Sequence, residues 1–202
     1  MNWSKSIWED RTSKTRADIV EAAMKLFLEN GFEPTSITAI ADEAGIARRT
    51  FFRYFATKES VVFADFTARQ AKPLTLLESR PHGEPAMASL LHVLRDVTDH
   101  PIDPKRAKRI RQIVATSPTL RERQRAIVLE GFGEQLVATL ARREPAGSDL
   151  ALRVIVSSAL GCLEVATMQY LRGSTRSVRD HFEEAVKISH EAWLSAESAL
   201  QR

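Results

Sequence analysis

The sequence has few of the features that mark a secreted, fibrous or low-complexity protein. Its 202 residues include one cysteine, Cys162, so no disulfide can form within the chain. With only 8 glycines and 8 prolines, a collagen-like or low-complexity composition is excluded. Hydrophobic residues make up 44% and charged residues 27%, which is the balance of a globular protein with one or two domains.

Signals for export or for a membrane span are also weak. Residues 1–16 alternate polar, aromatic and charged side chains and lack the apolar core of a signal peptide. The longest apolar stretch, residues 154–166, contains Ser157, Ser158 and Glu164, and it is shorter than the ~20 residues of a membrane helix. We therefore expect a cytoplasmic protein without a membrane partner.

Enzyme motifs are absent as well. The five histidines are scattered, and no Cys/His pair has the spacing of a zinc site. The run Gly131-Phe132-Gly133 lacks the third glycine of a dinucleotide loop, and no Gly-x-Ser-x-Gly elbow is present. We expect no catalytic residue, no metal site and no cofactor.

Apolar residues recur at helical spacing, and the alternation typical of strands is nearly missing. The pattern predicts an all-α fold of about nine helices: an N-terminal three-helix domain over residues 1–60, with 1–13 as a flexible extension, and a C-terminal helical bundle over 61–202 that forms a dimer. The expected helices lie at about residues 16–30, 36–45, 48–55, 58–73, 86–98, 104–116, 118–143, 149–172 and 177–199.

The net charge of +3 is mild, but two segments are strongly basic. Residues 45–58 carry four basic side chains and no acidic one, and residues 105–125 carry eight basic side chains and one acidic one. Such runs are most often solvated faces. They also suit an anionic partner, and charge alone does not decide between these two interpretations.

Two short predicted helices separated by Gly45-Ile46 fit a helix-turn-helix. The second helix begins with Arg48 and Arg49, where a recognition helix presents side chains to base edges, and arginine pairs with guanine O6 and N7. We predict base contacts by these two arginines. Hydroxyl and cationic side chains beside them are the predicted phosphate contacts: Ser36, Thr38, Thr50, Arg53, Tyr54 and Lys58. The alternative is a helical hairpin with a solvated basic face.

A longer pattern runs from about residue 16 to residue 63. Its elements are Ile19-x-x-Ala22-Ala23-x-x-Leu26-Phe27, Gly31-Phe32, Ser36-Ile37-x-x-Ile40-Ala41-x-x-Ala44-Gly45-Ile46 and Thr50-Phe51-Phe52-x-Tyr54-Phe55-x-x-Lys58-Glu59. This pattern resembles the TetR-type transcriptional regulators, and residues 49–63 resemble a subgroup that includes mycofactocin-associated regulators. The chain departs from the family where it has Ala47 instead of a small capping Ser, Arg49 instead of Gly, and Phe52 instead of Tyr.

The resemblance implies a ligand-responsive, DNA-binding regulator, most often a repressor that a small molecule releases from a palindromic operator. It implies a homodimer built from the last two long helices. The helix expected at 149–172 suits this role because it is apolar around nearly its whole circumference; the alternative is the central helix of a monomeric bundle. The predicted interface residues are Ile155, Ala159, Leu163, Ala166 and Trp193.

The effector prediction combines two features of the middle of the chain. Candidate walls of an apolar pocket are Phe66, Leu90, Leu94, Ile110, Ile113, Phe132 and Leu136, each of which also suits a plain core. The basic run near residues 105–111 suits an anionic head group, so an acyl-CoA-like effector fits both; the alternative is that these charges face solvent or attract DNA. The rival function is an all-α lipid- or drug-binding protein without a DNA role.

Overall fold

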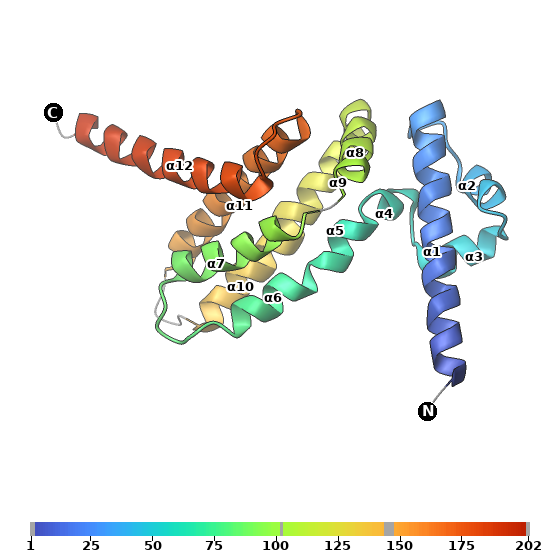
Figure 1. The fold of residues 1–202 in the computed structure, drawn as a ribbon, viewed down its shortest axis with the longest axis horizontal. Helices are drawn as coiled ribbons and strands as arrows, with labels where there is room; N and C mark the ends of the chain where they lie inside the picture. Colours follow the sequence, from blue (N-terminus) through green and yellow to red (C-terminus); the bar gives the residue numbers. More distant parts are fainter. Residues whose placement is uncertain (1–2, 102, 144–147, 201–202) are drawn as a thin grey trace. The chain divides into compact units, whose positions relative to one another are not determined.

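The structure is a computed structural model that describes residues 3–101, 103–143 and 148–200, and within these ranges the side chains of residues 12–192 and 194–196. The described residues form helices and their connections and include no strand (Figure 1), which confirms the all-α prediction. The chain divides into two compact units, residues 1–68 with 105–124, and residues 69–104 with 125–202. The segment 105–124 thus belongs with the N-terminal helices, whereas the sequence predicted a single boundary after residue 60.

The first unit is built on a long helix. It contains α1 (Trp3–Asn30), α2 (Ile37–Glu43), α3 (Arg48–Tyr54), α4 (Lys58–Val62), α5 (Ala64–Arg69), α8 (Pro104–Thr116) and α9 (Pro118–Arg125), of which the last residue of α5, the first of α8 and the last of α9 fall in the other unit. The apolar stripe of α1 is buried as its spacing predicts, with Ile19, Ala23 and Phe27 in the core. The helix begins at Trp3 instead of following a flexible extension, since residues 3–13 contain neither proline nor glycine to interrupt it.

The second unit is a helical bundle. It contains α6 (Ala71–Glu78), α7 (Ala86–Asp99), the π-helix η1 (Ala126–Gly133), α10 (Glu134–Arg143), α11 (Asp149–Leu171) and α12 (Val178–Leu200). The helix α11 packs against α12, α7 and α10. The core of this unit includes aliphatic side chains of α7 and α10 together with Phe182 of α12.

Two helices that the sequence predicts as continuous are broken in the structure. The helix expected at 58–73 is divided into α4, α5 and α6. Pro73 lies in the first turn of α6, where its missing N–H is tolerated, but it cannot continue a helix that began before it. The helix expected at 118–143 contains the π-helical segment η1, which includes Gly131 and Gly133, two residues with low α-helix propensity.

The connection between α6 and α7 is held by two arginines. Arg143 donates to the carbonyl oxygens of Arg80 and Pro81 at 2.6 and 2.7 Å. The Glu84 carboxylate accepts from Arg80 at 2.5 and 2.9 Å and from the buried Ser89 hydroxyl at 2.6 Å. The hydrogen bonds from Arg80, followed by that from Ser89, lower the pKa of Glu84 to about 2.

Candidate nucleic-acid interface

The turn between α2 and α3 has the geometry that a helix-turn-helix requires. Gly45 adopts φ +65°, and its N–H donates to the carbonyl of Asp42 at 3.1 Å, while the N–H of Ile46 donates to that of Ala41 at 2.9 Å. These two bonds form a Schellman motif, in which the left-handed residue is usually glycine. The turn therefore stops α2 at a defined residue and directs the chain into α3.

The start of α2 is capped as the sequence suggests. The Ser36 hydroxyl accepts a hydrogen bond from the N–H of Ala39 at 3.0 Å, and its O–H hydrogen stays free to donate to another acceptor. Thr38 lies exposed in the first turn of α2. Both predicted phosphate contacts on this helix are thus at the protein surface.

The helix α3 is anchored on one side and exposed on the other. Phe51 is fully buried and contacts the rings of Phe52 and Phe55 at centroid distances of 5.6 and 5.9 Å. Arg48 and Arg49 lie exposed in the first turn, and the Arg48 guanidinium lies 5.6 Å from the centre of the Phe52 ring. A short, rigidly anchored helix that presents two arginines at its N-terminal end has the features of a recognition helix.

The end of α3 carries a second pair of polar side chains. Arg53 donates to the Tyr54 hydroxyl at 3.1 Å and its guanidinium lies 5.1 Å from the ring centre. This hydrogen bond is the main cause of a lowered Tyr54 pKa, which makes the phenol a better donor to an anion. Thr50 and Tyr54 are half-buried, whereas Arg53 is exposed.

Lys58, the first residue of α4, is directed into the protein. Its ammonium donates to the carbonyl oxygens of Phe32, Glu33 and Thr35 at 2.9, 3.0 and 3.2 Å. The Nζ atom also lies 4.3 Å from the centre of the Phe32 ring. Lys58, which the sequence predicts as a phosphate contact, thus binds backbone carbonyls of its own unit.

The basic run at residues 105–125 is partly neutralised within the first unit. Arg106 and Arg109 pair with Glu21 of α1 at 3.3 and 3.0 Å, and Arg106 also pairs with Asp65. Lys105 and Lys108 are exposed. These pairs are not predictable from the sequence, because Glu21 and Asp65 lie more than forty residues from their partners.

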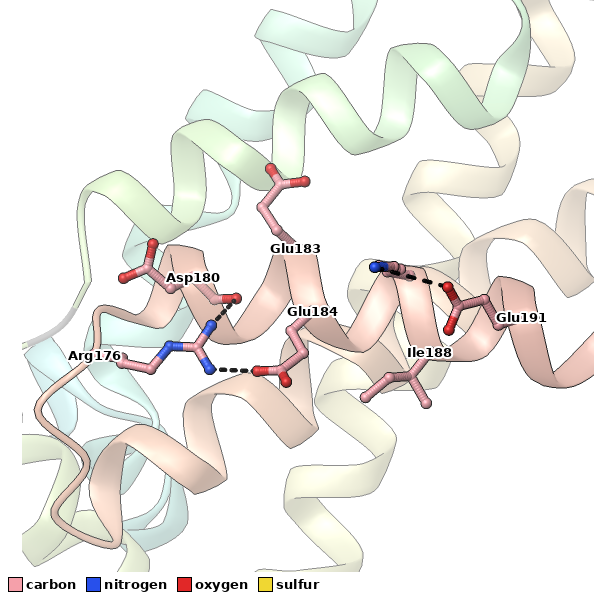
Figure 2. Close-up of a pocket in the computed structure, with 7 residues that line it drawn as sticks. Arg176, Asp180, Glu183, Glu184, Ile188 and Glu191 are labelled. Carbon is pink, nitrogen blue, oxygen red and sulfur yellow. Dashed lines mark hydrogen bonds and ion pairs between the residues drawn. The ribbon is translucent and has the colours of Figure 1, made fainter.

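The candidate pocket residues fall in both units. Phe66 and Ile110, in the first unit, are half-buried, and Ile113 is buried there. The four others are buried in the core of the second unit: Leu90, Leu94, Phe132 and Leu136. A hollow of about 480 Å³ lies elsewhere, along α12, and Figure 2 shows that charged side chains such as Arg176, Glu184 and Glu191 line it.

The exposed apolar face of α11 differs from the predicted one. Ala159 and Ala166 are 2% and 0% exposed because they face the core of their own unit, and Ile155 and Leu163 are half-buried. The Trp193 side chain lies outside the described residues. The exposed stripe instead follows positions three to four residues apart: Leu150, Val154, Ser157, Gly161 and Val165. By length and composition, α11 also meets the requirements of a membrane-spanning helix.

Among the described residues, no three His, Cys, Asp or Glu side chains come together as a metal site would require. The helix-turn-helix, with two exposed arginines opening its second helix, defines a DNA-binding protein of the helix-turn-helix class.

Comparison with known proteins agrees with this class. Residues 19–64 match the family described as bacterial regulatory proteins, tetR family. The chain is 30% identical over 174 residues to the putative mycofactocin biosynthesis transcriptional regulator MftR of Mycobacterium tuberculosis, across 84% of this chain and 86% of that protein. The chain therefore belongs to the TetR family of transcriptional regulators, and it is a DNA-binding regulator.

Two further similarities differ in how much of the chain they cover. The regulator TcmR of Streptomyces glaucescens is 37% identical over 84 residues, which are 42% of this chain and 37% of TcmR. The solved structure of FadR of Thermus thermophilus, a TetR-family repressor in complex with lauroyl-CoA, has a TM-score of 0.52 at 22% identity and covers 86% of this chain and 92% of FadR. The second similarity concerns the fold.

Proposed function

We propose that the protein is a repressor that binds a palindromic operator as a homodimer and places α3 of each subunit in the major groove. The observation that carries this proposal is the exposure of Arg48 and Arg49 at the first turn of α3, above the buried Phe51. Each arginine has the donor geometry to pair with O6 and N7 of a guanine. The repressor would act in the cytoplasm. Its operator would contain guanines in each half-site.

Phosphate contacts would hold this helix in register. Thr38 is exposed on α2, Ser36 keeps a free O–H hydrogen, and Thr50, Arg53 and Tyr54 lie along α3. Such contacts carry no sequence information but fix the orientation of the protein on the duplex. They also neutralise charge and make the affinity depend on salt concentration.

For the effector we propose a molecule with an apolar tail and an anionic head, such as an acyl-CoA. The tail suits the apolar side chains of the second unit, among them Leu94 and Phe132, and the FadR similarity points in the same direction. Arg106 and Arg109 pair with Glu21 within the first unit, so neither side chain is assigned to the head group.

Fluorescence anisotropy with a labelled duplex tests the proposal. The duplex is selected from randomised DNA by the wild-type protein. We expect Arg48→Ala and Arg49→Ala each to weaken binding by roughly 1–3 kcal/mol and to relax the preference for the selected sequence. Arg142→Ala, which removes an arginine of the second unit, is the matched control and should bind like the wild type.

Two outcomes would contradict the proposal. Unchanged operator preference in both Arg48→Ala and Arg49→Ala would exclude α3 as the reading helix. In the same assay, lauroyl-CoA should release the operator from the wild-type protein. Unchanged anisotropy at saturating lauroyl-CoA would exclude this class of effector.

A further inference from the structure

We propose that Lys58 positions the recognition helix by joining the two ends of the helix-turn-helix, and that it does not contact DNA phosphate. An ammonium group has three N–H donors. In the structure all three have carbonyl partners, in Phe32, Glu33 and Thr35, at 2.9 to 3.2 Å. A phosphate oxygen could bind Lys58 only by displacing one of these carbonyls.

The place of these carbonyls in the chain gives the contact its effect. Phe32, Glu33 and Thr35 form the turn after α1 and directly precede Ser36, the cap of α2. Lys58 is the first residue of α4 and directly follows the connection from α3. Residues 36–57, which contain both helices of the motif, are therefore closed into a loop by one side chain.

Both attachment points are themselves fixed. A capping box holds the backbone next to Lys58, because Thr57 and Ser60 exchange hydrogen bonds between side chain and backbone. On the other side, the Glu33 carboxylate accepts from the buried Ser117 hydroxyl at 2.7 Å, and Thr35 donates to the carbonyl of Gly31 at 2.7 Å. A contact between two rigid points restrains whatever lies between them, here α2 and α3.

The inference rests on the proposed function, since positioning α3 matters where α3 reads bases. Base readout by Arg48 and Arg49 requires bidentate geometry, which a small rotation of α3 destroys. Phosphate contacts from flexible side chains tolerate such a rotation better. Loss of Lys58 should therefore reduce sequence discrimination more than overall electrostatic attraction.

The test compares Lys58→Met and Lys58→Arg with Lys25→Met, which removes an exposed lysine paired with Glu43 and serves as the matched control. Binding of the wild-type-selected operator and of unrelated DNA is measured over a range of salt concentrations, well below the melting temperature of each variant. For both Lys58 variants we expect operator discrimination to fall roughly tenfold, about the loss of one bidentate base contact, with an unchanged salt slope. The melting temperature should fall as well.

The arginine variant separates positioning from phosphate binding. Its planar guanidinium cannot direct N–H groups toward three converging carbonyls, so Lys58→Arg should not restore discrimination. A phosphate contact would be restored by arginine, which binds phosphate well. Three results would each overturn the proposal. They are restored operator discrimination in Lys58→Arg, a salt slope lower by about one in Lys58→Met, and a lower melting temperature with full discrimination.

A signal from the ammonium itself separates this inference from the proposed function. In the free protein, the three hydrogen bonds should slow proton exchange enough for the Lys58 ammonium to give a ¹H–¹⁵N signal, and that signal should persist in the DNA complex. Its absence from the free protein would overturn the contact. If the wild-type protein enriches no DNA sequence, the proposed function fails and positioning fails with it, even where the ammonium signal is present.

Discussion

Ala47 occupies the N-cap position of the recognition helix α3 but cannot cap it. Its backbone has the extended conformation of an N-cap, with φ −70° and ψ 144°, but its methyl side chain provides no cap for α3. Ser36 and Thr57, at the starts of α2 and α4, both accept a hydrogen bond from the backbone of the third helical residue. The recognition helix is thus the one helix of these three without a side-chain cap.

Ala47→Ser should therefore stabilise the protein. A serine hydroxyl in this backbone conformation can accept from the free N–H groups of the first turn, and such a cap contributes about 1 kcal/mol. Urea unfolding measures the change in the free energy of unfolding. Ala17 is an exposed residue away from both ends of α1, so Ala17→Ser is the control and should be neutral or slightly destabilising. Equal effects at both positions would mean that the cap does not form.

Sequence patterns predicted the environment of some individual residues and not of others. The spacing of apolar residues identified the buried face of α1, and Arg48 and Arg49 are exposed as a recognition helix requires. The partners of Lys58 were not predictable, because a lysine at a helix start is equally suited to phosphate and to backbone carbonyls. Only the fold brings the turn at residues 32–35 to the start of α4.

At the scale of elements, the connection between α6 and α7 depends on charge. Glu84 accepts from Arg80 and Ser89, and this region also receives the Arg143 side chain from α10. The sequence predicts no element between the helices expected at 58–73 and 86–98. Neither an ion pair across four residues nor side-chain hydrogen bonds to carbonyls about sixty residues away are visible in composition, so the order within this connection was not predicted.

Acid should weaken this connection, and Glu84→Gln should remove part of that sensitivity. Folding lowers the pKa of Glu84 from its ordinary 4.5 to about 2. A lowered folded-state pKa contributes stability that is fully present above 4.5 and is lost as the pH falls toward 2. The free energy of unfolding should therefore fall less steeply in Glu84→Gln than in the wild type over this range.

Urea unfolding at a series of pH values measures this difference. Glu130→Gln, which changes an exposed carboxylate on η1, is the matched control and should follow the wild-type curve. Parallel curves for Glu84→Gln and the wild type below 4.5 would show that the ion pair contributes no acid sensitivity.

At the scale of the whole molecule, an apolar face of α11 is exposed to solvent. Val154 and Val165 are 54% and 53% exposed and lie on one stripe with Leu150 and Gly161. Contiguous exposed apolar surface of this kind marks an interaction site. A second copy of the chain, as family membership implies, would bury it. The sequence predicted the helix but not the stripe, since an all-apolar circumference does not reveal which side faces the chain's own core.

Val165→Glu should therefore dissociate the dimer. An unpaired carboxylate buried between two subunits costs on the order of 3–5 kcal/mol, which raises the dissociation constant at least about 100-fold. Light scattering coupled to size-exclusion chromatography measures the mass, and Ala138→Glu on the exposed side of α10 is the control. A dimer of unchanged affinity in Val165→Glu would place the interface elsewhere.

Selection of DNA from a randomised pool tests the central claim, that two copies of α3 read a two-fold symmetric operator. The wild-type protein should enrich two inverted half-sites that contain guanines and whose centres are about one helical turn, ~34–36 Å, or a small multiple of it apart. The Arg48→Ala, Arg49→Ala double variant should lose the guanine preference. Enrichment of no sequence, or the same enriched sequence from the wild type and the double variant, would contradict the account.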